Sequence, residues 1–282
     1  SLSVVLDPTF TTNLSSAITL CSGDALSVTT PGSSVSYQWY SSTDGTNWNT
    51  ISSATSSSYV PTVEQYYKVI ATSSNCTIES EVTDVTINAL PSYTTDLIAT
   101  QSVCDGTSLT VTATSTGSVS YQWYESSDNS TWTAISSATL SSYIPVSSQY
   151  YKVIATDGTT SCTKESTVSN VTVDAMPIST LSVSDATICQ GSSATITVSS
   201  SESGYSYQLR NDADDSSVGS PVTGTGSDIT FSVSPSSTTT YNVLVTNGVC
   251  TEELSDQSTV TVNALPTITG TSTVCVGSTV TL

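Results

Sequence analysis

The feature that most constrains this sequence is an internal repeat of about 85 residues. The segment SYQWYSSTDGTNWNTISSAT at 36–55 returns as SYQWYESSDNSTWTAISSAT at 120–139, with 13 of 20 positions identical. A Cys-x-Gly motif occurs four times, and successive cysteines of this motif lie 83, 85 and 86 residues apart. A chain that repeats one unit of this length is expected to fold as tandem copies of one domain.

The repeats divide the chain into five segments. We expect the end of a preceding repeat at 1–8, full repeats at 9–90, 91–176 and 177–265, and the start of a further repeat at 266–282. The full repeats end in INALP, VDAMP and VNALP. Because proline fixes φ and has no amide donor, it ends the last strand and stiffens the joint. The sequence therefore predicts an elongated rod, and a chain that is one piece of a longer protein.

Apolar and polar residues alternate within each repeat, as they do in β-strands. The first repeat contains ALSVT, VSYQWYS, QYYKVIAT and VTDVTIN, separated by turn clusters such as TPGSS and TDGT. About seven short strands per 85 residues are typical of a two-sheet sandwich with Greek-key connections. No sustained helical periodicity is present, so we predict an all-β protein.

The order of motifs resembles an immunoglobulin-like domain. A glycine turn precedes the second strand, Trp39 lies on the third, and Tyr67 opens the sixth. The usual cysteines of that pattern would fall near Thr30 and on Val69, so the disulfide between the two sheets is missing. The resemblance implies tandem immunoglobulin-like β-sandwich domains. It also implies a core built on these residues: Trp39, Trp123, Tyr67, Tyr151, Tyr241.

Composition and charge exclude several classes of function. The chain has twenty-three acidic residues and only four basic ones, which gives a net charge of −19. This charge argues against binding to nucleic acid or to anionic lipid. No apolar run approaches the length of a membrane span, so no membrane insertion is expected. The sequence has no histidine and no catalytic or nucleotide-binding motif, so we predict no enzyme activity and no catalytic residue.

Each full repeat carries one cysteine before its second strand and one after its sixth. An even count without Cys-x-x-Cys favours disulfides over zinc and indicates an extracellular protein. The preferred pairing is within each repeat: Cys21–Cys76, Cys104–Cys162, Cys189–Cys250. If the cysteines sit at turns on opposite poles of the domain, their Cα atoms lie too far apart, because a disulfide needs about 7 Å or less. The alternative is then a staggered pairing, Cys21–Cys162 and Cys104–Cys250, with the partner of Cys275 outside this sequence.

Two further tryptophans and an acidic loop are candidate binding sites. Trp48 and Trp132 follow predicted hairpin turns, where they either pack over the sheet edge or stack on sugars. The third repeat has no tryptophan, which weakens a sugar-binding role in every copy. The segment NDADD gathers carboxylates that suit calcium, although it lacks the full EF-hand spacing. A solvated loop is the preferred interpretation, and calcium at these residues is the only cofactor considered: Asp212, Asp214, Asp215.

A closer resemblance rests on four motifs taken together. Cys-x-Gly, Tyr-Gln-Trp, YYKVIAT and a following Cys-Thr resemble the tandem immunoglobulin-like repeats of giant type IX-secreted cell-surface gliding adhesins, the SprB-like proteins. The resemblance covers nearly the whole chain, but the third repeat departs from it, with Leu209 in place of tryptophan.

The adhesin resemblance implies a structural stalk segment of a large secreted filament at the cell surface. Such a stalk projects a distal binding region and transmits force in adhesion or gliding motility. The expected partners are neighbouring repeats of the same chain, the secretion or motility machinery, and surface polysaccharide. Two alternatives are a carbohydrate-binding repeat array and spacer modules of a secreted multi-domain enzyme.

Overall fold

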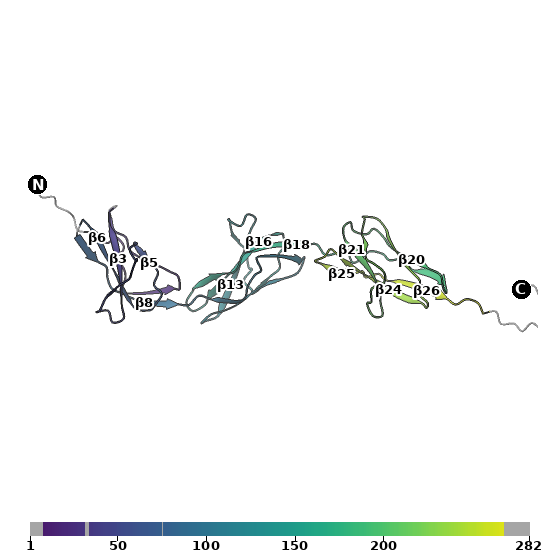
Figure 1. Cartoon of the computed structure of the whole chain (residues 1–282), viewed down its shortest axis with the longest axis horizontal. Coiled ribbons are helices and arrows are strands. Elements are labelled where there is room, and N and C mark those ends of the chain that lie inside the picture. Colours follow the sequence, from purple (N-terminus) through teal and green to yellow (C-terminus); the bar gives the residue numbers. More distant parts are fainter. Residues whose placement is uncertain (1–7, 32–33, 75, 268–282) are drawn as a thin grey trace, which may run out of the picture. The chain divides into compact units, whose positions relative to one another are not determined.

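The computed structural model describes residues 8–31, 34–74 and 76–267, and every regular element in these residues is a β-strand. The strands form three repeated modules, β1 to β8, β9 to β18 and β19 to β26 (Figure 1). The predicted all-β fold of tandem immunoglobulin-like domains is therefore confirmed. Most of the predicted flanking segments, 1–8 and 266–282, lies outside the described residues, as does Cys275.

None of the described residues belongs to a helix long and apolar enough to cross a membrane.

The first module consists of a long sheet and a short one. The long sheet has the strand order β1-β8-β6-β3-β4, with β7 also paired to β6, and β2 pairs with β5. The strands are β1 (Ala17–Cys21), β2 (Leu26–Ser27), β3 (Ser36–Ser42), β4 (Asn49–Thr50), β5 (Ser58–Tyr59), β6 (Tyr66–Ser73), β7 (Cys76–Glu79) and β8 (Thr83–Asn88).

The second module repeats this plan and adds one small sheet. Its long sheet has the order β10-β18-β16-β13-β14, with β17 paired to β16, and the small sheets are β11-β15 and β12-β9. The strands are β9 (Ser92–Thr95), β10 (Thr100–Cys104), β11 (Leu109–Thr110), β12 (Thr112–Thr114), β13 (Val119–Ser126), β14 (Thr133–Ala134), β15 (Ser142–Tyr143), β16 (Gln149–Asp157), β17 (Thr163–Glu165) and β18 (Ser169–Asp174).

The third module keeps the long sheet and enlarges the short one. The long sheet is β19-β26-β24-β21-β22, with β25 paired to β24, and β20 pairs with β23. The strands are β19 (Ala186–Cys189), β20 (Ala194–Val198), β21 (Ser206–Asn211), β22 (Val222–Thr223), β23 (Ile229–Val233), β24 (Thr239–Thr246), β25 (Thr251–Glu253) and β26 (Ser258–Asn263).

The first strand of the long sheet runs parallel to the last strand. This pairing joins β1 to β8 and β19 to β26, whereas β3 and β6 are antiparallel, as are β6 and β8. The parallel strands therefore end at the same pole of the module, from which the chain leaves. We call this the exit pole. The strand β6 ends at the opposite one, the entrance pole.

A tryptophan fills the centre of the first two modules. Trp39 lies on β3 directly opposite Val69 on β6, and neither side chain is exposed. Trp123 and Val153 repeat this pair in the second module. The expected core residues are all buried in the structure: Trp39, Trp123, Tyr67, Tyr151, Tyr241. Valine thus fills the place where the immunoglobulin pattern has its second cysteine.

The repeated segment ISSAT and the residue after it satisfy the polar groups of the buried tryptophan. The amide of Trp39 donates to the carbonyl of Ala54 at 3.0 Å, and its indole Nε1 donates to the carbonyl of Ser56 at 2.9 Å. The Tyr59 ring packs 5.8 Å from the indole. A buried indole N–H needs such a partner, because an unsatisfied buried donor costs about 1–3 kcal/mol. This explains why the turn and the tryptophan recur together.

The third module has a leucine at the position of the tryptophan. Leu209 lies opposite Val243 and is buried. Here the short sheet is longer, with five paired residues in β20 and β23 against two in β2 and β5. Phe231 and Ile196 on these strands belong to the core, so the longer sheet supplies the apolar volume that the smaller side chain lacks.

The second residue of the sixth strand is a tyrosine that ties the preceding loop to the sandwich. The Tyr67 hydroxyl donates to the carbonyl of Val63 at 2.7 Å. A tyrosine at the start of this strand, bonded to the backbone a few residues upstream, is the tyrosine corner of immunoglobulin-like sandwiches. The position was predicted from the motif YYKV.

Removing the central indole is expected to destabilise the first module strongly. Trp39→Ala should lower the free energy of unfolding by about 3–5 kcal/mol, because it opens a cavity and leaves the Ser56 carbonyl without its indole donor. Urea unfolding measures this loss. The control Thr86→Ala changes an exposed position of β8 and should stay within about 0.5 kcal/mol. Equal effects of the two variants would contradict the assigned core.

Candidate functional site: disulfide joints between modules

Two disulfides connect consecutive modules. Cys21 of the first module bonds to Cys162 of the second, and Cys104 of the second bonds to Cys250 of the third. Their Cα atoms are 5.6 and 5.5 Å apart. The preferred sequence-based pairing was therefore wrong, because these bonds do not occur: Cys21–Cys76, Cys104–Cys162, Cys189–Cys250. The structure contains the staggered alternative.

The parallel strand pair explains why a module cannot close its own disulfide. Cys21 ends β1 beside Asn88, the last residue of β8, at the exit pole. Cys76 follows the far end of β6, where it pairs with Ser73 at the entrance pole. The strand registers separate the two cysteines by about 11 residue rows, or roughly 35 Å. A disulfide spans about 7 Å or less between Cα atoms, so each cysteine can reach only a neighbouring module.

The Cys-x-Gly motif holds the exit-pole cysteine against the end of its module. The Ser22 amide donates to the Asn88 carbonyl at 2.8 Å, and the Asp24 amide donates to the Cys21 carbonyl at 2.9 Å. Gly23 has φ of +99°, in the left-handed region that glycine adopts without strain. The motif is thus a tight turn that fixes the cysteine beside the residue from which the linker departs.

A buried carboxylate organises the loop that presents Cys162. Asp157 is 0% exposed, and its Oδ1 accepts the amides of Thr159 and Thr160 at 2.7 and 3.0 Å. Its Oδ2 accepts the Thr116 hydroxyl at 2.8 Å and the Gly117 amide at 3.1 Å. These bonds, led by the Thr160 amide, hold the pKa of Asp157 well below its usual range, because they favour the ionised form. The Asp157 amide also donates to the Cys162 carbonyl at 2.9 Å.

An asparagine takes the same place in the third module. The Asn247 Oδ1 accepts the amides of Val249 and Cys250 at 2.9 and 2.7 Å. Its Nδ2 donates to the carbonyl of Ala175, in the segment that precedes the module, at 3.3 Å. The sequence analysis missed both Asp157 and Asn247. The available signal was the Asp-Gly or Asn-Gly pair at the end of the sixth strand and shortly before the cysteine.

Each disulfide lies within one compact unit of the chain. One unit comprises 1–101, 108–144 and 149–171 and contains Cys21–Cys162. The other comprises 102–107, 145–148 and 172–282 and contains Cys104–Cys250. The residues of the second module are divided between the two units. The Cys162 and Cys250 sides of the bonds are buried, at 1% and 0% exposure, which shields them from external thiols.

A lysine packs on the outward face of the long sheet in the first two modules. The Lys68 Nζ lies 3.1 Å from the Glu79 carboxylate and 4.6 Å from the centroid of the Trp48 ring. Lys152 repeats both contacts, 2.7 Å from Glu165 and 4.6 Å from the Trp132 ring. Both lysine side chains are only 11–12% exposed, so these cation–π contacts are largely desolvated.

The third module keeps the cation but moves it to the neighbouring strand. Arg210 on β21 stands where the first module has Tyr40, and Asn242 on β24 stands where it has Lys68. The guanidinium forms ion pairs with Glu253 and, at 3.3 Å, with Asp215. One paired cation on this face is therefore common to all three modules.

The comparisons with known proteins follow this modular pattern. A family model described as "Domain of unknown function (DUF8696)" matches residues 11–89, 94–175 and 179–264. The chain belongs to this family. No curated protein matches it.

Solved structures similar to the three DUF8696 modules are tandem immunoglobulin fragments. A three-domain fragment of titin is 13% identical with a TM-score of 0.38, covering 93% of this chain and 100% of its own. Extracellular domains 3–5 of Drosophila OTK are 12% identical with a TM-score of 0.38, covering 93% and 99%. Immunoglobulin domains 1–4 of Sidekick-1 are 13% identical with a TM-score of 0.24, covering 92% and 74%.

The two outer tryptophans of the DUF8696 modules are half-buried against the sheet. One face of each ring is occupied by a lysine ammonium, so a sugar that stacked on that face would first displace the cation. Edge packing thus describes the contacts of Trp48 and Trp132. Sugar stacking at these residues stays a prediction.

The acidic loop of the third DUF8696 module brings two of its three carboxylates, those of Asp212 and Asp215, to one asparagine amide. Asp214 accepts the Ser216 amide and hydroxyl, whereas Asp215 accepts the Asn242 amide nitrogen at 2.9 Å. Asp212 accepts a hydrogen bond from Gln257, in the loop before β26, and shares the Asn242 amide group with Asp215. No group of three or more acidic, cysteine or histidine side chains among the described residues is arranged to hold a metal ion. Calcium binding at these residues stays a prediction.

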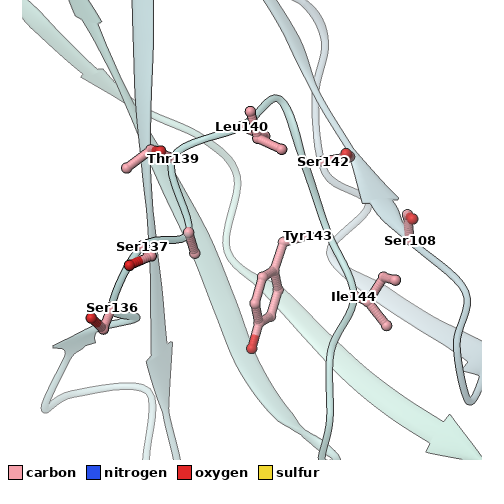
Figure 2. Close-up of a pocket in the computed structure, with 9 residues that line it drawn as sticks. Ser108, Ser136, Ser137, Thr139, Leu140, Ser142, Tyr143 and Ile144 are labelled. Atoms are coloured by element: carbon pink, nitrogen blue, oxygen red, sulfur yellow. The ribbon is translucent and has the colours of Figure 1, made fainter.

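A shallow depression of about 380 Å³ lies beside the ISSAT turn of the second DUF8696 module. Figure 2 shows the Tyr143 ring between this turn and Ile144, with serine hydroxyls around it. Burial raises the pKa of the Tyr143 phenol, and the other lining side chains do not titrate: Ser108, Ser136, Ser137, Ala138, Thr139, Leu140, Ser142, Ile144. A similar depression of about 250 Å³ surrounds Tyr59 in the first module. Both depressions follow from the turn that caps the buried tryptophan.

Replacing the buried carboxylate should weaken the loop that presents Cys162. Asp157→Asn keeps an acceptor at Oδ1 but turns a donor toward the Thr116 hydroxyl and the Gly117 amide. Because the pKa of Asp157 is lowered on folding, its contribution to stability is present above its unfolded pKa of about 4 and is lost as pH falls through the folded value. At pH 7 the urea midpoint of Asp157→Asn should therefore be clearly lower than that of the wild type. At pH 3 this difference in midpoint should be smaller.

The matched control for this variant is Asp84→Asn, at an exposed position of β8. This control should shift the midpoint little at pH 7. The difference in urea midpoint between wild type and Asp157→Asn could instead stay constant from pH 7 to pH 3. That result would show that the charge of Asp157 does not support the loop.

Proposed function

We propose that this chain is a structural stalk segment of a large secreted cell-surface adhesin filament. The stalk projects a distal binding region away from the cell and transmits force in adhesion or gliding motility. The observation that carries this proposal is the pair of disulfides that join consecutive modules. A disulfide placed between domains adds little to the core of either one, but it limits how far the two can separate.

Each joint has two covalent connections that start side by side. Cys21 pairs in register with Asn88, and the backbone linker Ala89–Pro91 leaves directly after that residue. The same arrangement places Cys104 beside Asp174, because the Asp105 amide donates to the Asp174 carbonyl at 2.9 Å. Two attachments resist twisting and bending of a joint better than one, which favours a rod-like stalk over freely jointed domains.

The chemical environment of the chain suits the outside of a cell. Disulfides persist in oxidising compartments and indicate an extracellular protein. In the proposed filament, the net charge of −19 keeps neighbouring stalks apart. Its partners are neighbouring modules, the secretion or motility machinery that exports and moves the filament, and polysaccharide at the surface to which the cell adheres.

Stretching a single molecule tests the mechanical role. With both disulfides intact, the shortest covalent path runs through 1–21, back along 104–162, and out through 250–282. This path contains about 110 residues and extends to about 400 Å, whereas the reduced chain of about 280 residues extends to about 1000 Å. When the oxidised chain is pulled by its ends in force spectroscopy, its extension should therefore stop at about 400 Å.

The control for this measurement is the double variant Cys21→Ser and Cys104→Ser, which removes both bonds. It should extend to about 1000 Å with or without reductant. The stalk proposal fails if the oxidised wild-type chain also reaches that length. It fails equally if the modules unfold at forces no higher than those of the reduced protein.

A further inference from the structure

One cysteine of the third module has the setting of a joint cysteine but no bonding partner among the described residues. Cys189 ends β19, is exposed, and has a free thiol. Its register partner is Asn263, the last residue of β26. A free cysteine alone has no assigned role, but the equivalent residues of the first two modules, Cys21 and Cys104, both form disulfides.

The backbone around Cys189 matches that of the two bonded exit-pole cysteines. The Gln190 amide donates to the Asn263 carbonyl at 2.9 Å, as the Ser22 amide does to the Asn88 carbonyl at 2.8 Å. The Ser192 amide donates to the Cys189 carbonyl at 3.0 Å, which closes the same turn. Gly191 has φ of +87°, close to the +82° of Gly106 in the second module.

The equivalent residues provide the second, independent observation. Cys21 and Cys104 occupy this position in the first two modules, and both bond to the loop cysteine of the module that follows. The third module therefore presents a preformed half of the same joint at its exit pole.

We propose that Cys189 forms a disulfide with the cysteine that follows the sixth strand of a further DUF8696 module, C-terminal to the third in the same chain. The sequence CVGSTVTL at 275–282 repeats the Cys-x-Gly start of such a module. The inference deepens the proposed stalk and depends on it only for the presence of that module. It makes the disulfide a regular connection between each module and the next.

The bond forms by thiol–disulfide exchange with an oxidant such as oxidised glutathione. One cysteine thiolate attacks the glutathione disulfide and releases one glutathione thiol. The second cysteine thiolate then attacks the mixed disulfide and releases the other. Two protein thiols thus lose two protons and two electrons, and one glutathione disulfide becomes two thiols.

Extending the chain by one module tests the proposal. Because CVGSTVTL aligns with 104–111, residues 112–176 are appended after Leu282 to complete a fourth module. The appended copy carries Lys164→Arg, so that its cysteine peptide differs in mass from the original. After refolding with oxidised and reduced glutathione, unreduced digests are mapped by mass spectrometry.

We expect a peptide that joins Cys189 to the appended copy of Cys162. The fraction of Cys189 that reacts with iodoacetamide should fall roughly tenfold relative to the chain that ends at Leu282. The matched control carries Cys162→Ser in the appended copy only, and its Cys189 should stay reactive. The bonds Cys21–Cys162 and Cys104–Cys250 in the same digests show that the first three modules have folded.

The proposal is overturned if those two bonds form while Cys189 stays reactive in the extended chain. It is also overturned if Cys189 is found joined to Cys275, to Cys76 or to a second molecule. Neither result bears on the stretching experiment, which depends only on the two disulfides already present, so failure of this inference and failure of the stalk proposal remain distinguishable.

Discussion

The parallel pairing of the first and last strands of each long sheet determines where the covalent connections can form. It brings Cys21 to the exit pole beside Asn88, while the antiparallel strand β6 carries the other cysteine of the module to the entrance pole. A separation of roughly 35 Å within a module excludes a bond there. The same geometry allows a bond between the exit pole of one module and the entrance pole of the next. In the chain-entropy model, closing a loop of 141 residues stabilises the folded state by about 5 kcal/mol.

In the proposed stalk, this connectivity would determine how a module carries load. The second module is held by Cys162 at its entrance pole and by Cys104 at its exit pole. Force applied through the two bonds therefore runs along the strands of the long sheet, so that neighbouring strands would have to slide past each other and lose many hydrogen bonds together. Pulling strands apart at one end would break those bonds one at a time. Asp157 anchors the loop at one of the two attachment points, where its buried carboxylate accepts two backbone amides.

Much of the fold could be predicted from the sequence, because the repeat length, the alternation of residues and the Trp-Tyr motifs are local signals. The buried positions of Trp39 and Tyr67 followed from such signals. The disulfide pairing could not be chosen this way, because it depends on the direction of β1 relative to β8, which pairs residues about 67 positions apart. Asp157 was missed for a similar reason: its bond to Thr116 joins residues 41 positions apart, and the sequence around it suggests only a turn.

Comparison of the three modules separates what the joints need from what a single sandwich needs. The third module replaces the central tryptophan with Leu209, enlarges its short sheet and moves the outward cation to Arg210. It nevertheless keeps the Cys-x-Gly turn at Cys189 and an Asx side chain at the loop of Cys250. In the third module, core and outer face thus change while the joint residues persist. A surface that bound one ligand in every copy would be expected to show the opposite pattern, with a constant outer face and freely varying joints.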